Sequence, residues 1–193
     1  MRRGNPELRK RQFINVVENT IYDCLKIFGY SKAPYIFETQ FDTTATIMIF
    51  AQGNRGVESA IYYDYQKFQR VFRDCDDQNR VYRLIHIVAH EMRHYYQFRQ
   101  VTAKKPRENG SIVREWKADR VIRNNSERNA YFGNVRELDA NAFAYMYMAD
   151  RFGVLLNGFG IPDNYRVRMN NYVKKLYGTS HPVFGPKYAK CFS

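Results

Sequence analysis

The sequence is poor in cysteine, in tryptophan and in long apolar runs. Its three cysteines, Cys24, Cys75 and Cys191, are an odd set without a CxxC pair, so they indicate neither a disulfide framework nor a cysteine zinc site. Reduced thiols of this kind are typical of a cytoplasmic protein. The longest stretches without a charge, such as residues 43–54, reach about a dozen residues, whereas a membrane-spanning helix needs about 20. We therefore expect a cytoplasmic protein and no membrane partner.

A secretory leader is not expected either. The N-terminal residues are basic, but the polar residues Asn15, Glu18 and Asn19 follow them where a leader has an apolar segment. The chain has 193 residues, of which 45% are hydrophobic and 26% charged, and this composition is that of a globular protein. We expect a single domain over residues 1–193, without internal repeats.

Acidic residues are scarce relative to basic ones. The chain has 31 Lys and Arg against 19 Asp and Glu, so its formal net charge is +12. Such a charge favours acidic partners, including nucleic acid, but a surface that only maintains solubility accounts for it equally well. Many basic residues lie in a polar stretch at about 103–134, which we interpret as a basic insertion that serves as a mobile lid or a docking surface.

Hydrophobic periodicity predicts an α+β fold. A first helix is expected to start at Asn5 and Pro6 and to end at Gly29. Three β-type runs then predict a small antiparallel or mixed sheet, and five helices follow them: the strands are expected at 34–39, 44–51 and 59–63, and the helices at 66–72, 79–102, 112–122, 137–151 and 163–176. We expect a small twisted sheet packed against the 79–102 and 137–151 helices, with extra N- and C-terminal helices.

The most informative segment is the HEMRH sequence, an instance of HExxH, within the 79–102 helix. His90 and His94 are separated by about 40° around the helix axis, one turn apart, so both imidazoles can reach one metal ion. Glu91 is close enough to touch a metal-bound water without being a ligand. Apolar residues cover one side of this helix and flank the histidine side as well, which is typical of a helix that lines a cleft.

A tetrahedral zinc site needs a third protein ligand, and Glu137 in the ELDANAFA segment is the preferred candidate. Asn141, one turn later, can accept a hydrogen bond from the second N–H of a ligand histidine. Asp139 points about 160° away from Glu137 on the helix, so both cannot bind the same ion. A favourable charge in a first helical turn is the alternative explanation of Glu137.

The remaining histidines fit the site less well. His86 lies about 12 Å from His94 along the helix axis, too far for one ion to bind His86, His90 and His94 together. His86 is expected either to contact the metal ligands without binding the ion or to be packed in the core. His181 can bind the metal or stabilise an oxyanion, and its spacing does not decide between these roles.

HExxH on one helix and ExxAN-x-FA on a later helix resemble the minimal gluzincin metallopeptidases, including the ImmA/IrrE-like group of phages and mobile elements. The resemblance implies that His90, His94 and Glu137 bind one Zn²⁺ per chain and that Glu91 is the catalytic base. Two features differ from the family: the 43 residues from His94 to Glu137 exceed the spacing in compact relatives, and YMYMADRFG replaces the usual leucine-rich continuation. The resemblance therefore supports the metal-binding residues better than it supports any particular substrate.

We accordingly expect a zinc-dependent hydrolase, a peptidase whose substrate is a protein or peptide. Glu91 takes a proton from the attacking water and delivers it to the leaving amine. Tyr131 is the first candidate for stabilising the oxyanion, followed by His181 and Tyr95. The alternative is a basic nucleic-acid-binding or regulatory module with a non-catalytic zinc site; its signal is the basic runs and the 16% of aromatic residues.

Overall fold

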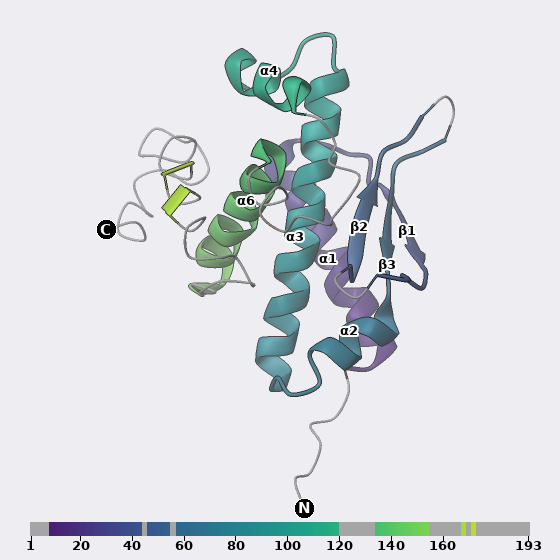
Figure 1. The fold of residues 1–193 in the computed structure, drawn as a ribbon. Coiled ribbons are helices and arrows are strands. Elements are labelled where there is room, and N and C mark those ends of the chain that lie inside the picture. The colour runs from purple at the N-terminus through teal and green to yellow at the C-terminus, as the bar shows by residue number, and fades with distance from the viewer. Residues whose placement is uncertain are drawn as a thin grey trace, which may run out of the picture. The chain divides into compact units, whose positions relative to one another are not determined.

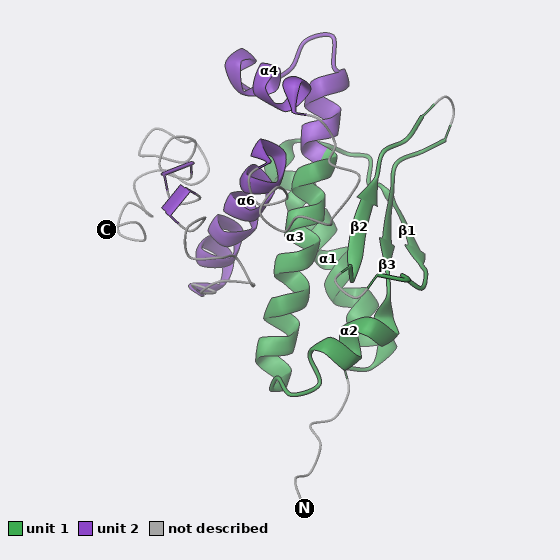
Figure 2. Cartoon of the chain, viewed as in Figure 1, with its two compact units in different colours: residues 1–95 green, residues 96–193 purple. Residues whose placement is uncertain are grey.

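The computed structural model describes residues 8–43, 46–54, 57–119, 134–154, 167–168 and 171–172. The chain divides into two compact units, residues 1–95 and residues 96–193 (Figure 2). Helix α3 (Asp77–Thr102) is continuous and contributes residues to both units. Each unit is described separately below, and the single domain expected from the sequence stays a prediction.

The described residues form five helices and three strands, which confirms a mixture of helices and a small sheet (Figure 1). The first unit holds α1 (Lys10–Phe28), β1 (Tyr35–Glu38), β2 (Met48–Ala51), β3 (Ala60–Tyr63), α2 (Tyr65–Val71) and most of α3. The second holds the end of α3, α4 (Gly110–Ala118) and α6 (Val135–Phe152). No helix in the described part of the chain is both long enough and apolar enough to cross a membrane.

The sheet is mixed, with the strand order β1-β3-β2. Strand β1 pairs with β3 in parallel, and β2 pairs with β3 antiparallel, with Phe50 opposite Ile61. Because side chains alternate between the faces of a sheet, Phe50 and Ile61 point to one face, where they are buried, while Ile49 and Phe37 are exposed on the other. Strand β2 is an edge strand, so one of its sides has no neighbouring strand among the described residues.

Phe13 of α1 connects the helices of the first unit to the sheet. Its fully buried ring lies 5.2 Å from the ring of Tyr63 on β3 and 5.3 and 5.2 Å from the rings of Tyr65 and Phe68 on α2. Aromatic pairs at such separations add to the free energy of burial. At its far end α1 stops at Gly29, whose positive φ of 67° is the left-handed conformation that glycine adopts readily.

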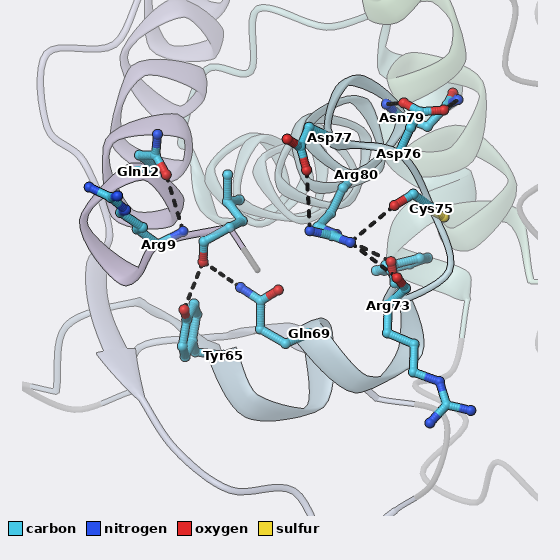
Figure 3. Close-up of polar contacts among 12 residues, drawn as sticks. Arg9, Gln12, Tyr65, Gln69, Arg73, Cys75, Asp76, Asp77, Asn79 and Arg80 are labelled. Carbon is cyan, nitrogen blue, oxygen red and sulfur yellow. Dashed lines mark hydrogen bonds and ion pairs between the residues drawn. The ribbon is translucent and has the colours of Figure 1, made fainter. Parts of the chain in front are cut away.

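The predicted start of the first helix is wrong for Leu8 and Arg9, which precede the first helical residue, Lys10. The carbonyl oxygen of Leu8 instead accepts hydrogen bonds from the Tyr65 hydroxyl at 2.7 Å and from the Gln69 amide at 2.6 Å. These long-range bonds, at the left of Figure 3, satisfy a backbone group outside the helix. Asn5 and Pro6 lie outside the described residues.

A buried arginine fixes the turn from α2 into α3. Arg80 is almost completely enclosed, and its guanidinium donates to the carbonyl oxygens of Phe72, Arg73 and Cys75 at 3.2, 3.2 and 3.0 Å (Figure 3). Asp76, just before α3, accepts from the backbone N–H of Asn79 at 2.8 Å. These contacts start α3 two residues before the predicted position and set its direction.

The second unit corrects the bounds of the helix predicted at 112–122. Helix α4 ends at Ala118, where the sequence predicts a helix to Ile122, and Asp119 is already extended. Ile112, Val113 and Trp116 are buried, so Gly110–Ala118 form an amphipathic helix; a role as a lid or docking surface stays a prediction. Residues 120–133 lie outside the described residues, as does nearly all of the helix predicted at 163–176.

Candidate metal centre

Helix α3, which carries the HExxH sequence, is enclosed on most of its circumference. Leu84, Val88 and Met92 are fully buried on one side, as the sequence predicts. On the remaining sides polar residues are buried too: His86, His90, Glu91, Arg93, Gln97 and Gln100. Since buried polar groups need partners, a helix with this many of them is suited to a functional site.

The two histidines of HExxH converge on one point. Nε2 of His90 and Nε2 of His94 are 3.1 Å apart, and the rings are nearly perpendicular, with centroids 4.7 Å apart. Two nitrogen ligands of one tetrahedral zinc ion, each at about 2.0–2.1 Å, would be about 3.3 Å apart. The histidine pair therefore already has close to the nitrogen separation that one ion requires.

The start of α6 is determined by two side chains that accept hydrogen bonds from its first turn. Asn134 Oδ1 accepts from the backbone N–H groups of Arg136 and Glu137 at 2.9 and 3.3 Å, and Asp119 Oδ2 accepts from Arg136 N–H at 3.0 Å. Such acceptors stabilise the N–H groups that have no partner inside the helix. Glu137 consequently stands at a fixed position in the first turn, where a carboxylate is also favoured by the helix dipole.

Gln97, on α3 one turn after His94, attaches this first turn of α6 to α3. Its Nε2 donates to the carbonyl oxygen of Arg136 at 2.9 Å and to Asp139 Oδ2 at 2.7 Å. Gln97 and Asp139 are both fully buried. Asp139 is therefore engaged in holding Gln97, in agreement with the expectation that it does not share an ion with Glu137.

Arg136, beside Glu137, is partly buried. Burial lowers the pKa of its guanidinium from the ordinary value, and the carboxylates of Asp119 and Glu137 oppose this effect. An arginine is fully charged under ordinary conditions despite such a shift, so Arg136 contributes a positive charge beside the Glu137 carboxylate.

Within the described residues, His90, His94 and Glu137 form a group that can hold a metal ion. One ligand atom from each residue lies within 4.8 Å of the other two. Two imidazole nitrogens and one carboxylate oxygen are one of the donor sets of catalytic zinc sites, which leave a fourth position for water or substrate. The residues thus fit a zinc ion in donor chemistry and in the spacing of the histidine pair.

Glu91 is placed by the sheet. Its Oε2 accepts a 2.7 Å hydrogen bond from the backbone N–H of Phe50 on β2, and the Phe50 ring packs edge-on against Tyr95 one turn later on α3. Ile47, three residues earlier in the chain, turns its carbonyl toward Asp64 N–H, just past the end of β3. Since N–H and C=O groups alternate in direction along a strand, the Phe50 N–H points outward from the sheet edge. It thereby holds the carboxylate of Glu91 at that edge.

Among the residues expected around the metal, Asn141 is buried and its Nδ2 donates to the carbonyl oxygen of Glu137 at 2.8 Å. Its Oδ1 is the atom that the predicted bond to a histidine requires, so that role stays a prediction. Tyr131 and His181 lie outside the described residues. The hydroxyl of the buried Tyr95 donates to the carbonyl oxygen of Lys32 at 2.8 Å, a core contact that engages it away from oxyanion stabilisation.

His86 is buried, and its pKa is lowered well below the ordinary value, chiefly by burial and further by the neighbouring His90 and Arg83. A neutral imidazole follows from this shift. His86 does not belong to the metal-binding group of the described residues, which agrees with the limit set by its distance from His94 along the helix.

Two parts of the site have no counterpart in the sequence analysis: the Phe50 N–H that holds Glu91 and the Gln97–Asp139 bond. The first is a bond from a backbone N–H, which every residue except proline has, so the type of residue at position 50 does not predict it. The second had a weak signal, since Asp139 is a charged residue among alanines in a segment that otherwise reads as buried. Comparison of the chain with family models, with curated proteins and with solved structures gave no match.

Proposed function

We propose that this protein is a zinc-dependent hydrolase, and specifically a peptidase of the gluzincin type that binds one zinc ion through His90, His94 and Glu137. The observation that carries the proposal is the 3.1 Å separation of the two histidine Nε2 atoms, with a Glu137 carboxylate oxygen within 4.8 Å of them. The resemblance of HExxH and ExxAN to the gluzincins, including the ImmA/IrrE-like group, points to the same ligands.

A catalytic role is favoured over a structural one by the number and type of ligands. Structural zinc sites are closed by four protein ligands, most often with cysteine among them, whereas catalytic sites have three and keep a position open. The described residues bring three ligands together and no cysteine. The alternative is a regulatory module with a non-catalytic zinc site, in which Glu91 would only hold the Phe50 N–H; the loss of hydrolysis in Glu91→Gln separates the two.

A bound zinc ion supplies Lewis-acid chemistry, because it polarises a carbonyl group and lowers the pKa of a coordinated water to about 7. Glu91 is the base in this proposal. Its Oε2 accepts from Phe50 N–H, which holds the carboxylate in place. In the proposed reaction the Glu91 carboxylate takes the proton of the attacking water and delivers it to the leaving amine.

A peptide is the proposed substrate because the HExxH and ExxAN segments resemble those of the gluzincin metallopeptidases. Within the first unit, Glu91 stands beside the edge strand β2, whose Phe50 N–H it engages. We also propose, as the sequence predicts, that the sheet packs against both the HExxH helix and the glutamate-bearing helix. A cytoplasmic location is proposed as well.

Metal content is the first test. The purified protein should contain about one zinc per chain, and elemental analysis should find the metal lost in His94→Ala and in Glu137→Ala. Asp139→Asn is the matched control, since it changes a carboxylate on the same helix that the proposal excludes from the ligands. If Glu137→Ala retains the metal and Asp139→Asn loses it, the assignment of Glu137 as the third ligand is wrong.

Hydrolysis is the second test. A proteome-derived peptide library would be incubated with the zinc-loaded protein and with Glu91→Gln, and cleavage products identified by mass spectrometry. The glutamine can still accept from Phe50 N–H but cannot accept the proton of a water, so it should keep zinc and lose about 10²–10⁴-fold in rate. Cleavage by Glu91→Gln at the rate of the unmodified protein would contradict the assignment of the base.

A further inference from the structure

A second cluster of charged residues lies on the second unit, apart from the metal ligands. Five basic side chains between residues 104 and 117 are exposed, and we refer to them as the α4 basic surface: Lys104, Lys105, Arg107, Arg114 and Lys117. Arg114 and Lys117 are three residues apart on α4, so they share one face of the helix. The other three stand in the segment that leads into α4.

The three acidic residues in this region, Glu108, Glu115 and Asp119, are all half-buried. The two carboxylate oxygens of Glu108 accept from the Tyr96 hydroxyl at 3.4 Å and from Asn109 N–H at 3.0 Å. Asp119 accepts from Arg136 N–H. Within the described residues, no ion pair neutralises Lys104, Lys105, Arg114 or Lys117. The exposed charge of this segment is therefore predominantly positive.

Contacts with α3 fix the backbone that carries the α4 basic surface. The side-chain oxygen of Gln100, which is buried, accepts from the backbone N–H groups of Arg107 and Glu108 at 2.6 and 3.0 Å. On the inner face of α4 the ring of Trp116 packs edge-on against Tyr96, with centroids 6.3 Å apart. The basic side chains thus project from a backbone that is fixed at both ends, which lowers the entropy cost of binding.

The aromatic residues in the described stretch 96–119 contribute little to its surface. Tyr96 and Trp116 are buried and Phe98 is half-buried, so none of them is fully exposed. Proteins that bind single-stranded nucleic acid use aromatic rings on which the bases stack. A surface with several cations and no fully exposed ring is suited to phosphate groups alone.

We propose that the α4 basic surface binds the phosphate backbone of double-stranded nucleic acid without sequence preference. Ammonium and guanidinium groups form charge-assisted hydrogen bonds with phosphate oxygens and release the counterions of a duplex. The net charge of +12 adds a long-range attraction that speeds the encounter. This binding is independent of the proposed hydrolysis, because no residue of the surface belongs to the metal centre.

The test measures binding of a 20-base-pair DNA duplex of scrambled sequence by fluorescence anisotropy at several salt concentrations. The double variant Arg114→Ala/Lys117→Ala should bind at least about tenfold more weakly, and the slope of log K against log salt should fall by about 1.8, or 0.9 for each lost phosphate contact. Arg11→Ala/Arg70→Ala is the matched control, because it removes two exposed charges from α1 and α2; it should leave the slope nearly unchanged.

Three results would overturn the proposal: equal losses in the two double variants, tighter binding of the single strand than of the duplex, or displacement of the duplex by polyglutamate at equal charge concentration. The last result would assign the surface to acidic proteins. Circular dichroism of each variant checks that the fold is retained, and Lys104→Ala/Lys105→Ala repeats the measurement outside the helix. Because no cleavage is measured, failure here leaves the hydrolase proposal intact, and the reverse also holds.

Discussion

Gln97 donates a 2.7 Å hydrogen bond to Oδ2 of Asp139, and both side chains are fully enclosed. The same amide group reaches the backbone carbonyl of Arg136. Together these bonds attach the first turn of α6, which bears Glu137, to the part of α3 that follows His94. Glu137, the proposed third ligand, is thus positioned by a pair of residues outside the group that can hold a metal ion.

Asp139 is expected to be more important for stability than for metal binding. Asp139→Ala leaves the buried Gln97 amide without its charged acceptor, and we expect a loss of about 1.5–3 kcal/mol in the free energy of unfolding. Asp139→Asn keeps an acceptor oxygen and should lose less. Urea unfolding with both variants measures the difference. An Asp139→Ala protein as stable as Asp139→Asn would show that the Gln97 bond contributes nothing.

Zinc should stabilise the folded protein, because a ligand that binds only the native state raises the free energy of unfolding. At a free zinc concentration one hundred times the dissociation constant, the gain is about 2.7 kcal/mol. A thermal melt with zinc and with a chelator should therefore show a higher Tm in zinc. His94→Ala is the control, and its Tm should be the same in both solutions. A zinc-dependent rise of equal size in His94→Ala would place the ion elsewhere.

The Phe50 N–H should contribute to stability through Glu91. Phe50→Pro removes this N–H, whereas Phe50→Ala keeps it, and both lose the ring that packs on Tyr95. Proline is tolerated on an edge strand where the N–H points away from the ladder. We expect Phe50→Pro to be less stable than Phe50→Ala by about 1.5–3 kcal/mol, since a buried carboxylate loses a donor.

A double-mutant cycle supplies the control for this comparison. In a Glu91→Ala background the carboxylate is absent, so the difference in unfolding free energy between Phe50→Pro and Phe50→Ala should shrink toward zero. A difference that persists unchanged in that background would reflect backbone strain from proline and not the bond to Glu91.

Lys67 is expected to fasten the segment that leads into β2. Its buried ammonium donates to the carbonyl oxygens of Phe41, at 3.0 Å, and of Thr43. Lys67→Met keeps the length of the side chain but leaves both carbonyls without this donor, which should cost about 1–3 kcal/mol. Urea unfolding measures the loss, and hydrogen exchange should rise at Phe41. Lys26→Met, at an exposed position of α1, should change stability by no more than about 0.5 kcal/mol.

The order of elements and the convergence of His90 and His94 on α3 could be predicted because both depend on local periodicity. His90 and His94 face the same way on any helix, so their convergence needs no knowledge of the rest of the chain. Gly29 and Gly153, both with positive φ, end α1 and α6 where the sequence places the ends of these helices. The alternation and length of the β-type runs likewise gave the three strands.

The errors arise where a distant residue determines local structure. Leu8 lies outside α1 because Tyr65 and Gln69, more than fifty positions away, bind its carbonyl. Helix α4 ends early because Asp119 is extended and bonds to Arg136. The placement of Glu91 by a backbone N–H depends on the register of β2, and no pattern of residue types encodes it. Contacts of this kind become visible only when the chain is folded.

The bond between Glu91 and Phe50 also bears on how the protein behaves in concentrated solution. The outward N–H of an edge strand is a template on which the strand of another molecule can pair, and charged groups at such an edge discourage this association. Glu91 is a buried charge at that edge of β2. A Glu91→Ala protein would therefore lose its guard against self-association together with its base, whereas Glu91→Gln still covers the Phe50 N–H. Glutamine is for this reason the better substitution for preparing an inactive form that stays monodisperse.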